Sequence, residues 1–168
     1  MFSERSQAAD IIKSYEGLRL IPYVCAGGQS TVGYGHLTSS LEAITKQEAD
    51  RLLLNDINRF EKQFKKIEIK LTQNKRDALI SLAFNLGHIP VDIIMNINGG
   101  NHEQLIRSWM SYRKAGNRIL LGLKRRRLAE LLLYYENSED IISDWKAARN
   151  FNSETIEQIK NTLIEKYK

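Results

Sequence analysis

Apolar residues recur at helical spacing along most of the chain. Those within about 3–15 fall on one face of a helix, and those that follow Thr45 form a longer stripe of the same kind. The same spacing predicts further helices after Asn74, over about 103–115, over about 123–137 and after Ser153. The sequence therefore predicts a mainly helical protein, in which the long helix after Thr45 joins two lobes.

Particular residues mark the ends of these helices. Gly17 is expected to end the first helix, because glycine adopts a left-handed C-cap without strain. Thr45 and Glu48 form a capping box at the start of the long helix, and Gly87 is expected to end the next one. Glu16 then lies at a helix C-terminus, where the helix dipole disfavours a negatively charged carboxylate.

The segment between the first two helices has a different pattern. Apolar residues on either side of the turn-rich stretch 26–30 predict a small β-hairpin or short sheet over about 18–36. Gly33 and Gly35 alternate with apolar residues there, which permits close approach of the backbone. We therefore expect a small sheet directly after the first helix.

Composition and charge narrow the class of protein. The chain has 168 residues, of which 42% are hydrophobic, and this suits one domain or two small lobes with a common core. Cys25 is the only cysteine, so an intrachain disulfide is impossible, zinc-ligand spacing is absent, and folding in a reducing compartment is expected. The formal net charge of +5 favours polyanionic partners, but it does not choose among nucleic acid, acidic lipid and bacterial envelopes.

The hydropathy of the chain also bears on where it acts. No apolar run is long enough for a signal peptide or a membrane-spanning helix, so no membrane anchor is expected. If the protein acts outside the cytoplasm, another factor has to release it.

The residues with the most informative chemistry lie between Tyr15 and Thr38. Glu16, Cys25 and Thr31 follow one another at separations of nine and six positions. Glu16 comes at the end of a predicted helix, and the other two come before and after a predicted turn. A hairpin folded back on that helix brings all three side chains to one cleft.

This stretch resembles the active-site region of the phage-type lysozymes, the T4-like endolysins. The pattern of that family is Glu, eight residues, Asp or sometimes Cys, five residues, Thr, and then Gly-Tyr-Gly-His. Glu16, Cys25, Thr31 and the run 33–36 match it position by position. Stretches 71–87 and 109–130 resemble helices of the family's larger lobe in the same order, and the similarity runs from about Ala8 to Tyr135.

The resemblance implies an α+β, mainly α, lysozyme-like fold with a small β-hairpin lobe and a larger helical lobe. We expect a single domain whose small lobe covers about 16–60 and whose large lobe covers about 1–15 and 61–137, followed by a helical extension over about 138–168. The implied reaction is hydrolysis of the β-1,4 bond between N-acetylmuramic acid and N-acetylglucosamine in peptidoglycan. No metal or cofactor, no nucleic acid and a monomer are expected. The implied route is that of a phage or prophage endolysin, which stays in the host cytoplasm until a holin releases it to the periplasm and the cell wall.

Within this resemblance each site residue has an implied role. Glu16 is the general acid, which must hold its proton near neutral pH. Cys25 departs from the commoner Asp, and a thiol with an ordinary pKa of about 8.5 is largely neutral at pH 7. We favour an inverting route in which Thr31 holds the attacking water and Cys25 assists it. Leu37, Phe84 and His36 are candidate substrate-binding residues; core packing is the alternative for the first two, and ordering of the hairpin or pairing with an acid is the alternative for His36.

Other interpretations remain open from the sequence. Trp109 and Trp145 are expected to be core or interface residues and not platforms for a sugar ring. The basic run 124–127 is expected on a solvated helix face, where it supports the fold or meets the anionic wall. A catalytically weak or inactive peptidoglycan-binding protein of the same fold is the first alternative, because Cys25 replaces the usual acid. A basic nucleic-acid binder is the second, and salt-dependent retention on DNA without muramidase activity would favour it.

Overall fold

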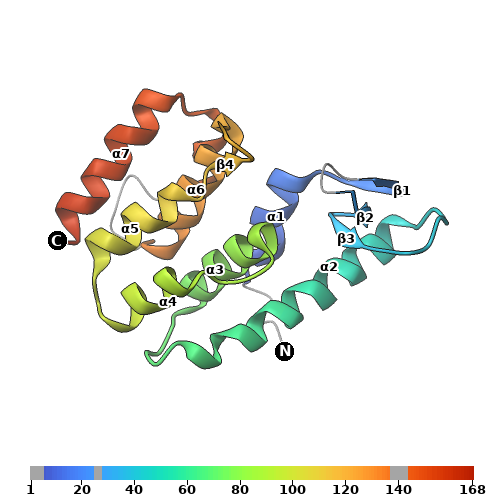
Figure 1. Cartoon of the computed structure of the whole chain (residues 1–168), viewed down its shortest axis with the longest axis horizontal. Coiled ribbons are helices and arrows are strands. Elements are labelled where there is room, and N and C mark those ends of the chain that lie inside the picture. The colour runs from blue at the N-terminus through green and yellow to red at the C-terminus, as the bar shows by residue number, and fades with distance from the viewer. Residues whose placement is uncertain (1–5, 25–27, 137–143) are drawn as a thin grey trace.

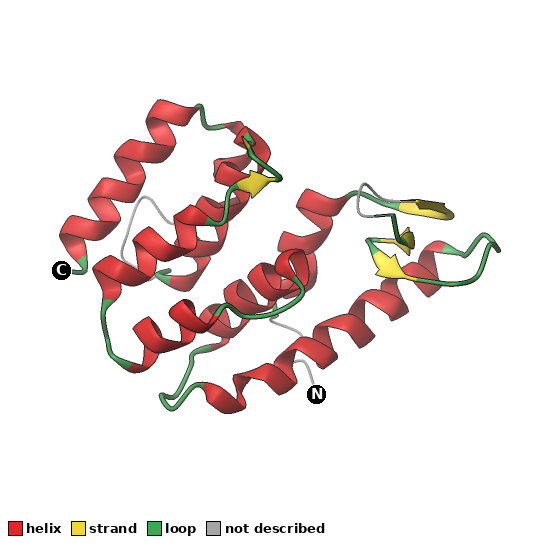
Figure 2. Cartoon of the chain, in the orientation of Figure 1, coloured by secondary structure: helices red, strands yellow, loops and turns green. Residues whose placement is uncertain are grey.

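The computed structural model describes residues 6–24, 28–136 and 144–168 of the chain. Helices dominate these residues, and the strands are few and short (Figures 1 and 2). The elements, in chain order, are α1 Ala8–Glu16, β1 Arg19–Val24, β2 Ser30–Gly33, β3 His36–Leu37, α2 Lys46–Glu61, the 3₁₀ helix η1 Lys62–Lys66, α3 Gln73–Leu86, α4 Val91–Asn98, α5 His102–Ser111, β4 Lys114–Ala115, β5 Arg118–Ile119, α6 Leu121–Tyr134, the 3₁₀ helix η2 Trp145–Asn150 and α7 Ser153–Lys166. The predicted α+β, mainly α fold is confirmed.

The expected small sheet follows α1 directly. Its three antiparallel strands lie in the order β1-β2-β3. Tyr23 of β1 pairs with Thr31 of β2, and Thr31 pairs in turn with Leu37 of β3. Arg19 pairs with Gly33, and the register shifts between Arg19 and Tyr23. Thr31 therefore occupies the central strand of the sheet.

The helix α2 runs from the sheet to the helical body (Figure 1). Its N-terminus is capped as expected, because the Thr45 Oγ1 accepts a hydrogen bond from the backbone N–H of Glu48 at 3.1 Å. Helix α2 packs against β2, α1 and α3. This single element thus holds the sheet at a set position relative to the helices.

The core lies among the helices of the body. Helices α3 and α6 pack against each other, and each has a continuous buried stretch, 77–83 in α3 and 126–134 in α6. Trp109 and Trp145 are buried, at 0% and 3% exposure, as predicted for core residues. The helix α7 packs on α5 and α6, and η2 packs on α6. The described part of the C-terminal segment therefore adds to the same helical body.

One helix prediction needs correction, and one helix was missed. The helix expected over 103–115 ends at Ser111, and Lys114 and Ala115 instead pair with residues 118–119 in the two-stranded hairpin β4–β5. Gly116 has a φ of 57°, a turn conformation that favours glycine and that a helix cannot contain. The short helix α4 was not predicted; of its eight residues, Ile93 and Ile97 are buried.

An ion pair joins α1 to α2 and makes the fold sensitive to acid. The Nζ of Lys13 lies 2.6 Å from Asp50, and that of Lys46 lies 2.9 Å from it. Hydrogen bonds from Lys13 and then Lys46 lower the pKa of Asp50 from 3.8 to about 2. Because the folded-state pKa is the lower one, this stabilisation is present above pH 3.8 and is lost as the pH falls toward 2.

We expect Asp50→Asn to lower the melting temperature at neutral pH by a small amount, since the pair is partly exposed to solvent. The difference from the unmodified protein should shrink as the pH falls through this window, and thermal melting at several pH values measures it. Glu48→Gln is the matched control, because the ion pair that Glu48 makes among the described residues is with Arg51 of the same helix, at 3.4 Å. A difference in melting temperature between the Asp50→Asn variant and the unmodified protein that stays constant with pH would contradict the stabilising role of the ionised Asp50 carboxylate.

Candidate active site

The candidate acid Glu16 is the last residue of α1, as predicted. The next residue, Gly17, has φ 71° and ψ 169°. This conformation is not the left-handed helical cap that was expected, because its ψ is extended and leads the chain straight into β1. Its positive φ still favours glycine. Glu16 consequently lies where the helix meets the sheet (Figure 1).

An arginine holds the carboxylate of Glu16. Its Oε1 accepts a hydrogen bond from Nη1 of Arg126 in α6. The side chain of Glu16 is 25% exposed, whereas that of Arg126 is 3% exposed. The carboxylate therefore has a buried guanidinium on one side and keeps partial access to solvent.

The guanidinium of Arg126 is itself fixed by two further contacts. Its Nη2 donates to the backbone carbonyl of Ser81 in α3 at 3.2 Å, and its Nε donates to Oε1 of Glu130 at 3.2 Å. Glu130 is fully buried. An arginine bonded in this way has little freedom to change its position.

The basic run 124–127 was expected on a solvated helix face, and this is wrong for two of its members. Arg126 and Arg127 are 3% and 0% exposed, because α6 is covered by α3, α5, η2 and α7. A signal for this was present, since Glu130 follows Arg126 by four positions and Arg127 by three, the spacings at which helical side chains meet. Sequence reasoning missed Arg126 as a partner of Glu16.

Tyr15, the neighbour of Glu16 in α1, is also part of this junction. Its hydroxyl donates to the backbone carbonyl of Arg125 at 3.2 Å. Burial, followed by the negative charge of Glu130, raises the pKa of Tyr15 to about 12. Tyr15 is therefore neutral near pH 7 and serves to tie the end of α1 to α6.

Of the other two predicted catalytic residues, the structure describes Thr31. Thr31 in β2 is 5% exposed, and its Oγ1 makes a long contact of 3.5 Å to the carbonyl of Tyr23. That weak contact leaves the hydroxyl with most of its hydrogen-bonding capacity. Cys25 lies outside the described residues.

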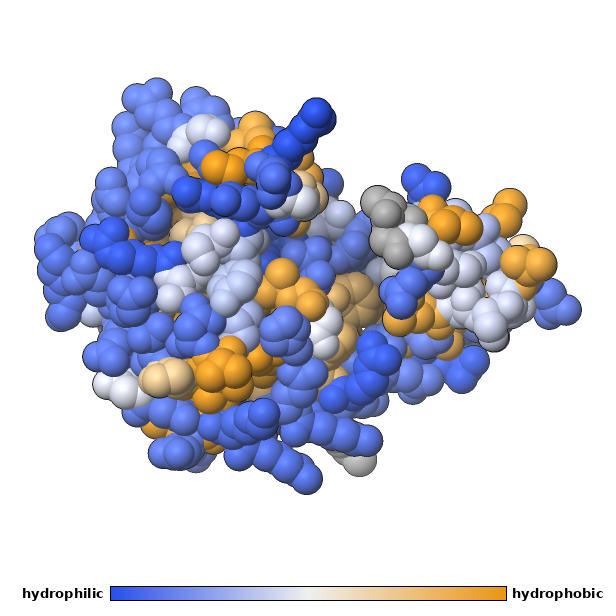
Figure 3. Space-filling view, viewed as in Figure 1, coloured by the Kyte–Doolittle hydropathy of each residue, from blue (hydrophilic) through white to orange (hydrophobic). Residues whose placement is uncertain are grey.

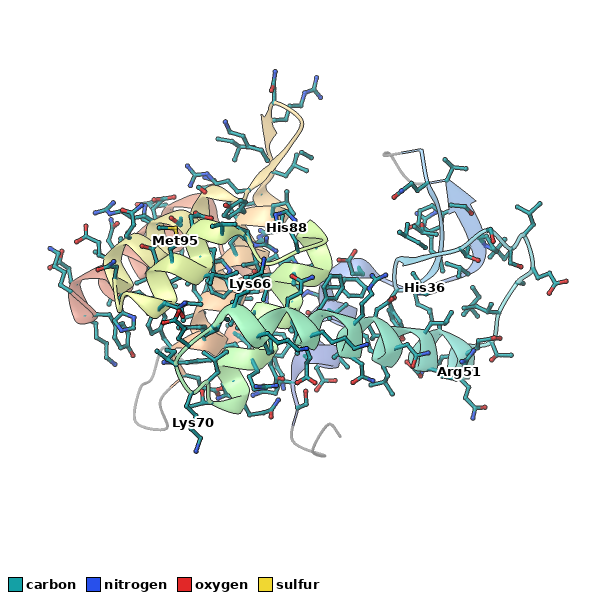
Figure 4. The ribbon with its side chains drawn as sticks, turned by 60° about the horizontal axis from the view of Figure 1, so that its bottom comes forward. His36, Arg51, Lys66, Lys70, His88 and Met95 are labelled. Carbon is teal, nitrogen blue, oxygen red and sulfur yellow. The ribbon has the colours of Figure 1, made fainter. Side chains whose placement is uncertain are left out.

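His36 pairs with an acid, which was one of the roles expected for it. Its Nδ1 lies 2.8 Å from Oδ2 of Asp56, a residue of α2 that is 6% exposed. Figure 4 shows His36 above α2, beside the sheet. The pair ties β3 to α2, so His36 contributes to the placement of the sheet; its role in substrate binding stays a prediction.

The remaining candidates lie in different surroundings. Leu37 is 49% exposed and lines an open recess of about 390 Å³ with its neighbours from 29–30 and 38–39. Phe84 is partly buried on α3, and its ring meets that of Phe60 edge-on with centroids 6.0 Å apart. The Gly35 turn sits so close that a Cβ there would lie 3.8 Å from the Phe84 ring. The structure thus supports a packing role for Phe84 and leaves Leu37 free to meet a ligand.

The space-filling view shows a recess between the sheet and the helical body (Figure 3). The Glu16–Gly17 step lies in the connection between these two parts (Figure 1). In this arrangement the partly exposed carboxyl group of Glu16 is bonded to the fixed guanidinium of Arg126 and lies next to the start of β1. A carboxyl group that keeps partial access to solvent at this junction is able to meet a ligand.

Comparison with known proteins agrees with this arrangement. Residues 13–130 match the sequence model of the phage lysozyme family. The chain belongs to that family. The matched segment contains Glu16, Thr31, Arg126 and Glu130.

Individual phage lysozyme relatives show the same likeness. The endolysin of Acyrthosiphon pisum secondary endosymbiont phage 1 is 38% identical over 135 residues, which are 74% of this chain and 92% of the relative. The endolysin of Bacillus phage B103 is 30% identical over 148 residues, which are 82% of this chain. The alignment spans only 56% of that relative's length.

Solved lysozyme and muramidase structures share the fold. A mutant of P22 lysozyme superposes with a TM-score of 0.67 at 28% identity, covering 81% of this chain and 100% of that one. The muramidase domain of SpmX from Asticaccaulis excentricus gives a TM-score of 0.71 at 29% identity, covering 82% and 100%. In the described part of the chain, none of the helices combines the length and hydropathy needed to cross a membrane.

Proposed function

We propose that this phage lysozyme family member hydrolyses the β-1,4 glycosidic bond between N-acetylmuramic acid and N-acetylglucosamine in bacterial peptidoglycan. The proposal rests on one observation above all. Glu16 ends α1 beside the sheet, is partly exposed, and is held by a buried arginine. The endolysin and muramidase relatives support the same class of substrate.

The reaction assigns a step to each site residue. Glu16 donates its proton to the glycosidic oxygen as the bond from that oxygen to C1 of the muramic acid breaks. A water attacks C1 from the opposite face and loses a proton, which gives inversion. We assign Thr31 to hold this water and Cys25 to assist it, and Leu37 to contact the sugar chain.

The wider setting follows from the same proposal. We propose that the chain works as a monomer and as one lysozyme-like domain, with a small lobe over about 16–60, a large lobe over about 1–15 and 61–137, and a C-terminal extension over about 138–168. The residues assigned to the reaction supply an acid and a positioned water without a metal or organic cofactor. As an endolysin the protein would wait in the host cytoplasm and reach the wall after release by a holin.

Digestion of purified peptidoglycan tests this function. We expect soluble fragments that end in reducing N-acetylmuramic acid, identified by mass spectrometry after borohydride reduction. Fragments that end in anhydro-muramic acid would show that the protein is a lytic transglycosylase and not a hydrolase. Binding to the wall without release of any fragment would instead favour the inactive, peptidoglycan-binding alternative.

Cys25 allows a separate test, because it is the only cysteine of the chain. We expect Cys25→Ser to weaken clearing of chloroform-treated Gram-negative cells and Cys25→Asp to preserve it, since a carboxylate assists water at least as well as a thiol. Alkylation of the unmodified protein should inhibit clearing. The Cys25→Ser variant treated with the same reagent is the control. Unchanged clearing after complete alkylation, verified by mass, would remove Cys25 from the mechanism.

A further inference from the structure

A fully buried carboxylate, that of Glu130, shares the guanidinium of Arg126 with the candidate acid Glu16. Glu130 of α6 is 0% exposed and receives hydrogen bonds from four side chains. Its Oε1 accepts from Ser81 Oγ at 2.8 Å, Arg127 Nη2 at 2.8 Å and Arg126 Nε at 3.2 Å, and its Oε2 accepts from Trp109 Nε1 at 2.9 Å. These donors come from α3, α5 and α6, so the packing of three helices fixes the carboxylate of Glu130.

Arg126 lies between the two carboxylates. Its Nε faces Glu130 and its Nη1 faces Glu16, while its Nη2 is bonded to the Ser81 carbonyl. A planar guanidinium with all three nitrogens engaged cannot rotate without breaking at least one of these bonds. The position of the Glu16 carboxylate therefore depends on that of Glu130, because both carboxylates are bonded to the same rigid guanidinium.

We propose that Glu130 is a positioning residue for the reaction of Glu16, acting through Arg126. The proposal rests on the glycosidase function proposed above. Glu130 is fully buried and does not meet the substrate, so its effect is on the acid and not on the glycan. Misplacement of a reacting group by about 1 Å can cost about a hundredfold in rate.

Glu130 also balances the charge around the acid. With both carboxylates ionised, Glu16, Arg126, Arg127 and Glu130 carry no net charge. A negative charge nearby favours the protonated form of an acid, and a positive charge favours the ionised form. Neutralising Glu130 would leave Arg126 with Glu16 as its sole carboxylate partner among these four groups, which would then carry a net positive charge.

Other charged groups near α1 are placed differently. Arg125 of α6 and Arg149 of η2 act on Tyr15, the neighbour of Glu16. Asp50 of α2 is paired with Lys13. Asp77 of α3 accepts a hydrogen bond from the N–H of Gln7, next to the opposite end of α1. Among these charged groups, Glu130 forms an ion pair with Arg126, and Arg127 forms an ion pair with Glu130.

Glu130→Gln is the direct test, with kcat and KM measured on soluble, uncross-linked glycan strands over a range of pH. We expect kcat to fall about tenfold or more with little change in KM. We also expect the alkaline limb of the kcat/KM profile to move to lower pH, since that limb reports loss of the proton from the acid. Glu130→Asp keeps the charge and should return the limb toward that of the unmodified protein.

The effect of Glu130→Gln on folding has to be separated from its effect on the position of Glu16. The substitution leaves the buried Arg127 without its carboxylate partner. Burial lowers the pKa of Arg127, and its Nε and Nη1 have no hydrogen-bond partner among the described residues. If Glu130→Gln does not fold, the double variant Arg127→Met/Glu130→Gln removes the stranded cation, and Arg127→Met alone is its control. We expect the double variant to be folded by circular dichroism and to keep the reduced kcat.

The outcomes distinguish this inference from the function on which it rests. A folded Glu130 variant with the kcat and pH profile of the unmodified protein would overturn the positioning role alone. A loss of activity that is equal at every pH, and that tracks the loss of folded protein, would also overturn it. Absence of glycan cleavage by the unmodified protein would overturn the proposed function itself.

Discussion

Glu16→Gln should abolish lysis of bacterial cells while the protein remains folded. Glutamine has the shape of the glutamate side chain and still offers an oxygen to Arg126, but it has no acidic proton for the leaving sugar oxygen. General acid catalysis contributes about 10² to 10⁴ in rate, so we expect a loss of that order. Turbidity clearing of chloroform-treated cells and release of reducing ends from peptidoglycan both measure it.

The controls for Glu16→Gln address folding and specificity. Circular dichroism should show an unchanged helix content, because the substitution is at the partly exposed end of α1. Glu103→Gln is the matched control, since Glu103 is a partly exposed acid on α5 that pairs with Arg107 away from the site. Activity of the Glu16→Gln variant equal to that of the Glu103→Gln variant would exclude Glu16 as the acid.

Trp109→Ala should have the largest effect on stability. The indole is fully buried, packs edge-on against Tyr134 with centroids 5.4 Å apart, and donates its Nε1 hydrogen to Glu130 at 2.9 Å. Loss of a buried tryptophan costs about 3–5 kcal/mol, and an oxygen left without its donor adds about 1–3 kcal/mol. Against a typical total of about 5–15 kcal/mol, this substitution removes much of the stability of the protein.

Urea unfolding followed by circular dichroism measures the effect of Trp109→Ala. Trp109→Phe serves as the matched variant, because phenylalanine keeps an aromatic ring in the core and loses the hydrogen bond to Glu130. We expect its midpoint to lie between those of the unmodified protein and of Trp109→Ala. A Trp109→Ala midpoint close to that of the unmodified protein would contradict the role of the indole in this core.

Most helices and the small sheet could be predicted because their signals are local. The apolar spacing that identifies α3 and α7 is read within a few turns, and so is the Thr45 cap of α2. The small sheet could be predicted from the apolar residues on either side of the turn-rich stretch 26–30. The hairpin β4–β5 was missed because its strands have two residues each, too few to show a period of two.

Burial of Arg126 and Arg127 could not be predicted from the local pattern of the sequence. A run such as 124–127 is usually solvated, and a helix that is covered on all sides shows no polar face by which to place its charged residues. The i,i+3 and i,i+4 spacing to Glu130 indicated possible ion pairs, but on an exposed helix the same spacing would be equally suitable. Only the packing of neighbouring helices distinguishes the two cases.

The sequence by itself determined that an acid would lie at the end of a helix beside a small sheet, because helix periodicity, a following glycine and the motif spacing are all properties of neighbouring residues. Only the tertiary structure decided what holds that acid. Arg126 is separated from Glu16 by 110 positions, and their contact depends on how α6 packs against α1 and α3. Local periodicity shows which face of a helix is buried, but it does not say which two faces will meet.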